Sequence, residues 1–294
     1  MKRPLHALYL QTTPARQEES VDALMRIIAR TFPDADARLL IVDNALDSPC
    51  ERHVAPNVTL IDGDNRGREF TGLDRGIAWL RSKGEPRDDA IMLIANDTLL
   101  RDKEATDFFR LDGGFVLRQL DRSRILGHVD CLVAPIEVFG NSIDHWVRFN
   151  FVLCTYGVLK QLAPLSLPYE DADIFSDSPA EFFRPGVGLS ETYRVFLKAF
   201  LQGQPNAALW RWHSARPIGA DNFAAFRSKA KAIICEHYLS GQARRKGFEL
   251  VDISRRHIPS KEVRARIRRF LYNTSAWRLV PRFRRRFASS PPAR

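Results

Sequence analysis

The stretch RLLIVDNA, residues 38 to 45, decides the fold that the sequence predicts. Residues 39 to 42 are all apolar, whereas a strand with one solvated face alternates apolar and polar side chains. Such a run is typical of a parallel strand buried on both faces, and IMLIA at residues 91 to 95 has the same character. We therefore expect a mostly parallel sheet that is flanked by helices.

Strand and helix patterns alternate around this stretch. In the first hundred residues we predict strands within 5–14, 37–45, 57–65 and 89–98, and helices within 18–33 and 69–83. This order is that of an α/β fold, in which ligands bind at the carboxyl ends of the parallel strands. Those ends carry Thr12, Asp43, residues 62–65 and residues 96–98.

The second half of the sequence has a less regular pattern. The predicted elements are one or two strands and a helix within 128–162, an acidic loop at 168–185, helices within 189–205 and 223–247, and a strand at 206–217.

Three glycines, Gly67, Gly72 and Gly76, lie in NRGREFTGLDRGIAWL, residues 65 to 80. Glycine is unfavourable inside a helix, so each of them needs a physical reason. One reason is local, because a turn from strand to helix needs unusual backbone angles and close packing. The other is a ligand, such as a phosphate or a nucleotide, that approaches the backbone where the helix begins.

The bulk composition is that of a folded protein. The 294 residues are 45% hydrophobic, and no apolar run approaches the roughly 18 residues that cross a bilayer. The four cysteines lie far apart and show no spacing typical of a zinc site or a disulfide framework. The N-terminal segment is too short and too mixed in polarity for a signal peptide, so we expect a cytoplasmic protein.

The net charge of +10 comes from the C-terminus. Residues 255–294 hold 13 Lys and Arg against Glu262 alone, a net charge of +12, which leaves −2 for residues 1–254. Aromatic and aliphatic residues interleave with these arginines, which favours a basic amphipathic helical tail on an anionic membrane surface. A disordered or helix-packing C-terminus is the next alternative. Nucleic acid ranks last, because the near-neutral body offers no further basic track.

Three segments, taken in order, resemble the GT-A fold glycosyltransferases of the family 2 type, which use nucleotide sugars to build bacterial surface polysaccharides. The segments are VDNA at 42–45, DNRGREFTGLDRGI at 64–77 and IMLIANDT at 91–98. The sequence departs from the family pattern at Asp74, where Asn is usual, and at Asn96, where an acid is common. The resemblance implies one Rossmann-like GT-A domain. This domain covers 1–254, with a nucleotide-sugar-binding half at 1–100 and an acceptor half at 101–254, and the basic tail at 255–294 follows it.

The resemblance also implies a metal site. Asp97 stands at the surviving carboxylate of the family's metal-binding element, and His213 matches a histidine that often follows a later strand. Mg²⁺ or Mn²⁺ needs only one or two protein carboxylates when phosphates and water complete its shell, and it would neutralise a diphosphate leaving group. The local alternatives are that Asp97 caps a turn and that His213 packs beside two tryptophans.

Glu191 is the predicted catalytic base. By resemblance, SETYRVFLKAFLQGQP at 190–205 has the layout in which an acidic residue opens a helix before a glycine and a strand. Its carboxylate would take the proton from the acceptor hydroxyl. An acid also stabilises any helix start through the helix dipole, and Asp171 and Asp173 are rival candidates.

The predicted contacts to the nucleotide sugar lie at strand ends and in the glycine loop. By resemblance, Asp43 would bond the nucleobase or ribose, and the turn around Asn65 would approach the donor. Arg68, like Arg66, could bind the diphosphate through its guanidinium group, or could simply be solvated. The predicted donor-binding residues are Thr12, Asp43, Asn65, Gly67, Arg68 and Asn96.

These features together predict a glycosyltransferase at the inner face of a membrane. It would move a sugar from a nucleotide donor to a glycan or a lipid-linked acceptor, with inversion implied by the resemblance. Two alternatives stay open. One is another nucleotide-dependent transferase, such as a nucleotidyltransferase, and the other is a non-catalytic nucleotide- or glycan-binding protein with a degenerate site.

Overall fold

The computed structural model describes residues 3–12, 17–101, 105–204, 212 and 214–254. The basic tail at 255–294, His213 and most of the strand predicted at 206–217 lie outside these residues. The described residues of that last segment, Trp212 and 214–217, form no strand.

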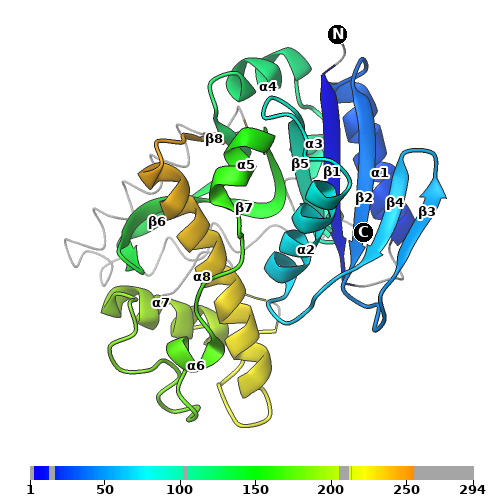
Figure 1. Cartoon of the computed structure of the whole chain (residues 1–294). Coiled ribbons are helices and arrows are strands. Elements are labelled where there is room, and N and C mark those ends of the chain that lie inside the picture. The colour runs from blue at the N-terminus through cyan, green and yellow to red at the C-terminus, as the bar shows by residue number, and fades with distance from the viewer. Residues whose placement is uncertain (1–2, 13–16, 102–104, 205–211, 213, 255–294) are drawn as a thin grey trace, which may run out of the picture.

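The described chain is a mixed α/β structure built on one eight-stranded sheet (Figure 1). Its strand order is β3-β4-β2-β1-β5-β7-β6-β8. The strands are β1 (Pro4–Gln11), β2 (Asp36–Asp43), β3 (Glu51–Ala55), β4 (Val58–Asp62), β5 (Ile91–Asn96), β6 (Ile125–Val138), β7 (Asn141–Thr155) and β8 (Leu250–Asp252). The helices are α1 (Gln17–Thr31), α2 (Glu69–Ser82), η2 (Leu99–Arg101), α3 (Ala105–Phe108), α4 (Gly113–Leu120), α5 (Tyr156–Leu162), α6 (Asp171–Ile174), α7 (Glu191–Gln202) and α8 (Phe223–Arg245).

Four strands predicted from the sequence, β4, β2, β1 and β5, lie side by side and parallel. Their register pairs Gln11 with Asp43, Asp43 with Asp62, and Leu10 with Asn96. The carboxyl ends of the four strands therefore meet at one edge of the sheet, as the alternation of strands and helices predicted.

The rest of the sheet has one more parallel pair, β6 with β8, and adds antiparallel pairs to the mostly parallel arrangement that the sequence predicts. The strand β3 folds back on β4, and β7 runs antiparallel to both β5 and β6. The turn from β6 to β7 consists of Phe139 and Gly140, both at positive φ. A two-residue turn of this kind reverses the chain, whereas a parallel connection needs a longer crossover. The sheet is therefore mixed.

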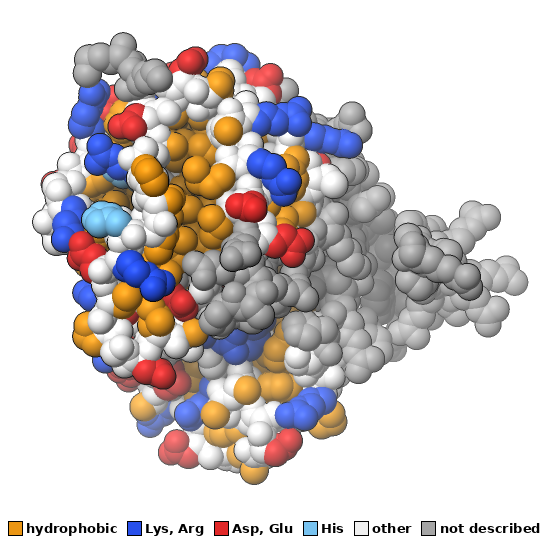
Figure 2. Space-filling view, turned by 90° about the vertical axis from the view of Figure 1, so that its right-hand side faces the viewer, with side chains coloured by type: hydrophobic (Ala, Val, Ile, Leu, Met, Phe, Trp, Pro, Cys, Tyr) orange, Lys and Arg blue, Asp and Glu red, His pale blue; other side chains and the backbone are white. Residues whose placement is uncertain are grey.

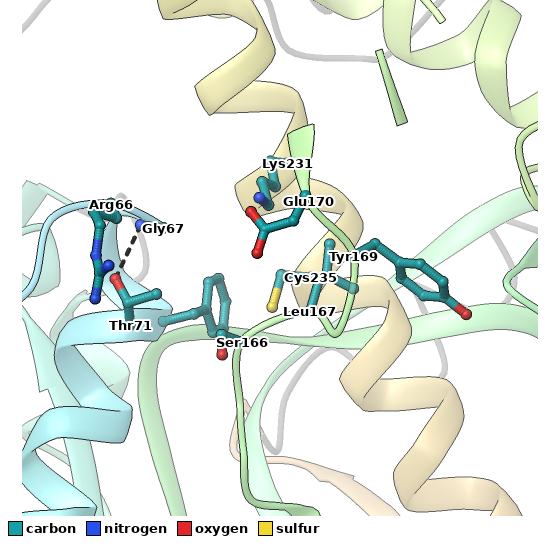
Figure 3. Close-up of a pocket in the computed structure, with 10 residues that line it drawn as sticks. Arg66, Gly67, Thr71, Ser166, Leu167, Tyr169, Glu170, Lys231 and Cys235 are labelled. Carbon is teal, nitrogen blue, oxygen red and sulfur yellow. Dashed lines mark hydrogen bonds between the residues drawn. The ribbon is translucent and has the colours of Figure 1, made fainter. Parts of the chain in front are cut away.

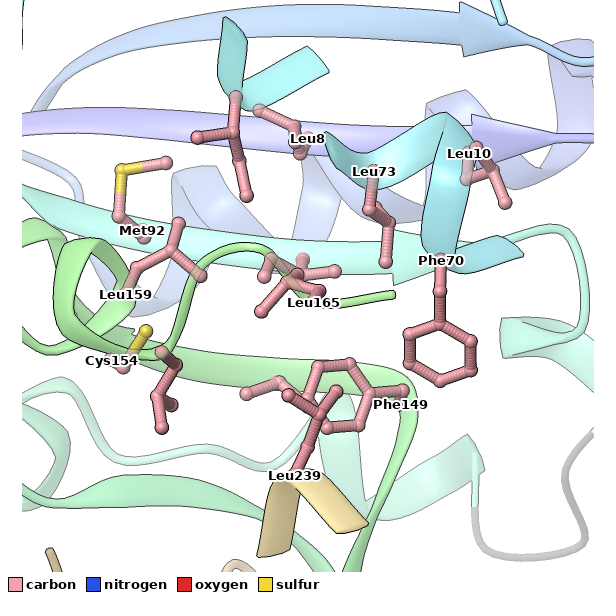
Figure 4. Close-up of a cluster of buried hydrophobic side chains, with 14 of the residues drawn as sticks. Leu8, Leu10, Phe70, Leu73, Met92, Phe149, Cys154, Leu159, Leu165 and Leu239 are labelled. Atoms are coloured by element: carbon pink, nitrogen blue, oxygen red, sulfur yellow. The ribbon is translucent and has the colours of Figure 1, made fainter. Parts of the chain in front are cut away.

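Two clusters of buried side chains cover the two faces of the sheet. Helices α2, α5 and α8 pack on one face, and their buried side chains form one cluster with Leu8 and Leu10 of β1 (Figure 4). Helices α1, α3 and α4 pack on the other face, against Ala7 and Tyr9. Successive residues of β1 thus point into opposite clusters, which confirms that the apolar runs are strands buried on both sides.

One face of the described residues carries charged side chains of both signs (Figure 2). On the face in Figure 2, acidic and basic side chains are interspersed around a group of hydrophobic ones, and neither sign of charge dominates. Among the described helices, none combines the length and the apolar character that a membrane span requires.

Close packing explains the two glycines that lie within α2, Gly72 and Gly76. A Cβ atom on Gly72 would lie 2.5 Å from the side chains of Asn44 and Leu10. A Cβ atom on Gly76 would lie 2.9 Å from Leu8 and 3.0 Å from Val42. Both glycines let α2 approach β1 and β2, so the local explanation holds for them.

Gly76→Val should lower the free energy of unfolding by about 1–3 kcal/mol, because the added side chain overpacks the contact between helix and sheet. Ala78→Val is the matched control, since it places the same β-branched residue on the exposed face of the same helix. Urea denaturation of both variants measures the difference. Equal stability of the two variants would show that this contact is loose.

Candidate functional site

A pocket of about 440 Å³ lies at the carboxyl ends of β1 and β5. Its walls come from the strand ends, the segment before α2, β7 and α8, so both halves of the chain contribute. We call it the strand-end pocket. Its lining residues are Leu10, Thr12, Asn65, Arg68, Glu69, Asn96, Asp97, Thr98, Asn150, Ser228, Lys229 and Glu236. Five predicted site residues are therefore brought together here: Thr12, Asn65, Arg68, Asn96 and Asp97.

Asp97 is the first residue beyond β5 and is held firmly in place. Its amide donates to the carbonyl of Leu10 at 3.1 Å, which continues the pairing of β5 with β1. Its Oδ2 accepts hydrogen bonds from the amide of Thr12 at 3.2 Å and the hydroxyl of Thr12 at 2.6 Å. The residue is only 8% exposed. Within the described residues no group donates to Oδ1, so this oxygen remains available to a ligand.

Asn96 and Thr98 form a local turn at the same strand end. The Oδ1 of Asn96 accepts hydrogen bonds from the amide of Thr98 at 3.0 Å and from its hydroxyl at 2.6 Å. Both acceptor positions of this oxygen are thereby used. Asn96 can offer a ligand its NH₂ group, and its oxygen does not supply a second metal ligand.

Asp43 lies behind the pocket. It is 5% exposed, its Oδ2 accepts from Nε2 of Gln11 at 2.8 Å, and its Oδ1 accepts from the amide of Ala45 at 2.8 Å. These bonds tie the end of β2 to the end of β1 and close the turn after β2. A contact of Asp43 with a nucleobase or ribose stays a prediction.

Arg68 opens α2 with an unusual backbone, at φ 55° and ψ −132°. Non-glycine residues with positive φ are uncommon and persist where the surroundings fix them. Here Nδ2 of Asn44 donates to the Arg68 carbonyl at 3.1 Å, and Nε of Arg68 donates to Oγ of Ser228 at 2.6 Å. The start of α2 is therefore fastened to both β2 and α8 at the wall of the pocket.

A second pocket of about 260 Å³ is lined by Arg66 and Gly67 of the segment before α2 (Figure 3). We call it the loop pocket. The predicted donor contact Gly67 lines it, and the Gly67 amide donates to Oγ1 of Thr71 at 3.0 Å. Its lining residues are Arg66, Gly67, Phe70, Thr71, Ser166, Leu167, Tyr169, Glu170, Lys231 and Cys235. Gly67 is thus separated from the other predicted donor contacts.

The structure does not bring Glu191 to either pocket. It is the first residue of α7, its side chain is 73% exposed, and it is ion-paired with Arg194. Its assignment as a base stays a prediction. Of the rival acids, Asp171 is ion-paired with Lys231 at 2.7 Å and Asp173 closes the first turn of α6. The predicted metal ligand His213 lies outside the described residues.

Asp74, which departs from the family pattern, has a structural role. Its two carboxylate oxygens accept from the amides of Leu165 at 2.6 Å and Ser166 at 2.9 Å. It thereby anchors the segment after α5 to α2 and helps to shape the loop pocket.

Sequence reasoning missed Glu236, Lys229 and Asn150, which line the strand-end pocket from α8 and β7. Oε1 of Glu236 accepts a hydrogen bond from the amide of Phe149 at 3.0 Å. Burial raises the pKa of Glu236 to about 7. The nearby cations Lys229 and Arg148 act in the opposite direction. The signal in the sequence was a single acid in the apolar run AIICEHYL at 232–239.

The charges in the strand-end pocket bear on what it can bind. Arg68 and Lys229 face three acids, Glu69, Asp97 and Glu236. A diphosphate would add further negative charge, so its binding calls for a cation at the phosphates. Among the described residues no group of three or more His, Cys, Asp and Glu could hold a metal ion. The available Oδ1 of Asp97 nevertheless fits a Mg²⁺ or Mn²⁺ ion whose remaining ligands are phosphate oxygens and water.

Comparisons with known proteins do not identify a family. No family model matches the sequence, and no curated protein matches it. One solved structure that resembles the fold is described as a 4-diphosphocytidyl-2C-methyl-D-erythritol synthase. It shares 15% identity over 55% of this chain and 79% of its own, with a TM-score of 0.34. That likeness is too small to carry an argument about function, which must rest on the site itself.

Proposed function

We propose that the protein is a nucleotide-dependent transferase, and specifically a glycosyltransferase that takes its sugar from a nucleotide-sugar donor. The observation that carries the proposal is the strand-end pocket. The residues Thr12, Asn65, Arg68 and Asp97, singled out from separate parts of the sequence, line one cavity at the carboxyl ends of parallel strands.

The donor's diphosphate would occupy the strand-end pocket. Arg68 and Lys229 supply donors for phosphate oxygens, and Asn65 and the NH₂ group of Asn96 supply neutral ones. A divalent cation held by Oδ1 of Asp97 and by the phosphates would neutralise the charge that develops on the leaving group. The fixed turns at Thr12 and Arg68 keep these groups in place before the donor binds.

Calorimetric titration with UDP, GDP, dTDP and CMP, each with and without Mn²⁺, tests this proposal. We expect one nucleotide to bind at least tenfold more tightly with Mn²⁺, because the pocket alone repels a diphosphate. Asp177→Ala, which removes an exposed acid outside both pockets, is the control and should bind like the wild type. If no nucleotide binds at millimolar concentration, a nucleotide-dependent activity is excluded.

Product analysis separates the proposed reaction from its alternatives. A glycosyltransferase releases a nucleoside diphosphate, or CMP from a CMP-sugar, when it is given the matching nucleotide sugar. A nucleotidyltransferase would need a nucleoside triphosphate and release pyrophosphate. A binding protein would retain the nucleotide sugar without release of either product.

For the tail at 255–294, the proposal keeps the prediction made from the sequence, which is binding to an anionic membrane surface. We expect the full chain to sediment with vesicles that contain anionic lipid, and to lose this behaviour when residues 255–294 are deleted or salt is raised. Vesicles of neutral lipid are the control. Equal sedimentation of the truncated chain would contradict a membrane contact through the tail.

A further inference from the structure

Glu236 occupies an unusual position on α8. Its neighbours Cys235 and His237 are buried at 2% and 1% exposure, whereas Glu236 itself is partly exposed and lines the strand-end pocket. Asp97 and Thr12 line the same cavity from the ends of β5 and β1. A partly exposed acid that lies between two buried residues of a helix, at the wall of a cavity, needs an explanation, because such a carboxylate is largely removed from water.

A bulge in β7 supplies a hydrogen bond to the carboxylate of Glu236. In the ladder between β6 and β7, Gly127 pairs with Val152, and the next pair is Val129 with Val147. The strand β7 therefore has more residues than β6 between these two pairs. The extra β7 residues therefore leave the regular ladder, and the amide of Phe149 donates to Oε1 of Glu236 instead. Bulges of this kind often lie beside functional sites, where they redirect side chains.

This bond fixes one carboxylate oxygen and leaves the other free. No described group donates to Oε2, so it can exchange a proton with a ligand in the cavity. The charged groups around it are Glu69 and Arg68 from α2, Lys229 from α8, and Asp97 from the end of β5. From β7 the nearby cation is Arg148, which is itself paired with Asp130 at 2.5 Å.

We propose that Glu236 is the general base of the transfer reaction, an inference that rests on the proposed function. As the acceptor oxygen forms its bond to the anomeric carbon, Oε2 takes the hydroxyl proton. The bond between the anomeric carbon and the phosphate oxygen breaks, and its electron pair leaves with the nucleoside diphosphate. Glu191, exposed and paired with Arg194, is the competing assignment.

The pH dependence of the reaction follows from the environment of Glu236. A base acts only when it is deprotonated, and the pKa of this carboxyl is raised to about 7 by burial. The rate should therefore rise with pH through neutrality and level off above pH 8. Removal of the carboxyl should remove this rise.

The test compares Glu236→Gln with Glu191→Gln. The amide oxygen of glutamine can still accept the Phe149 bond, so the first variant keeps the local structure. The probes are UDP-glucose, UDP-N-acetylglucosamine, GDP-mannose and dTDP-glucose with water as the acceptor, and release of the nucleoside diphosphate is measured. We expect Glu236→Gln to lose about 10²–10³-fold in rate and to bind the nucleotide within about threefold of wild type. Glu236→Asp should recover part of the rate.

Proton uptake provides a readout without turnover. A diphosphate bound near Glu236 favours its protonated form, so calorimetry at pH 7.5 in buffers of different ionisation enthalpy should show uptake on binding. Glu236→Gln should abolish this uptake, and Glu181→Gln, an exposed acid outside both pockets, should keep it.

The outcomes separate the two proposals. If the wild type binds no nucleotide, the proposed function fails and this inference fails with it. If the wild type binds the nucleotide but Glu236→Gln keeps normal proton uptake, Glu236 is not the base and the proposed function stands. Loss of rate in Glu191→Gln with full activity in Glu236→Gln would overturn the assignment in favour of Glu191.

Discussion

Asp97→Asn should reduce release of the nucleoside diphosphate by about 10³-fold and abolish the gain in nucleotide affinity from Mn²⁺. The substitution removes the charge that would hold the cation. It keeps an oxygen that can accept the bonds from Thr12, whose hydroxyl lies 2.6 Å from Oδ2 of Asp97 in the native protein. Calorimetry and product release measure the two losses, and thermal unfolding checks that the fold is intact.

Thr12→Val separates the charge of Asp97 from its position. This variant loses the hydrogen bond from the Thr12 hydroxyl to Asp97 but keeps the Asp97 carboxylate. We therefore expect release of the nucleoside diphosphate to fall by less than about tenfold, as for a metal ligand that is slightly misplaced. If Asp97→Asn kept its Mn²⁺-dependent affinity, Asp97 would be a turn residue and the metal site would have to lie elsewhere. If Thr12→Val lost as much as Asp97→Asn, the effect would be one of local structure.

Glu236→Gln should make the protein more stable at pH 8, by on the order of 2 kcal/mol, and leave its stability unchanged at pH 4. The pKa of Glu236 is raised from 4.5 to about 7 by burial, so the folded state binds a proton that the unfolded state releases between these values. As pH rises from 4.5 to 7, this group therefore costs the wild type stability that the neutral amide does not lose.

Urea denaturation at pH 4, 6 and 8 measures this difference between Glu236→Gln and wild type. Glu181→Gln is the control, because its carboxyl is exposed and should change stability equally little at every pH. If the free energies of unfolding of Glu236→Gln and wild type differed by the same amount at every pH, Glu236 would be well solvated. A gain in stability at pH 8 together with a loss of turnover would be the pattern of a group retained for function.

The parallel part of the sheet and the edge of the sheet that holds the strand-end pocket could be predicted from the sequence, because both depend on local patterns. Apolar runs of four or five residues, as in RLLIV, mark strands buried on both faces wherever they occur. The polar residues after each run then mark the edge. Asp97 and Thr12 were found in this way, and the register of β1 with β5 brings them together.

The rest of the fold and of the candidate site could not be predicted from the sequence, because it depends on contacts between distant parts of the chain. The strand β3, ERHVA, is exposed at all five residues and carries no apolar signal. Glu236 reaches the pocket only because α8 packs across the bulge of β7, and no local pattern encodes that contact. The assignment of Glu191 used a feature that many helices share, an acid at the first turn, and such a feature does not say where the helix lies.

The pairing of β5 with β7 has a practical consequence for anyone who wishes to produce the first hundred residues as a separate fragment. In the whole chain, Ile91–Ala95 of β5 pair with Phe151–Thr155 of β7. A fragment that ends near residue 100 would leave β5 with a free edge and would uncover side chains buried on both of its faces. Apolar strands with open edges recruit other chains, so the isolated fragment should precipitate rather than act as a small nucleotide-binding module.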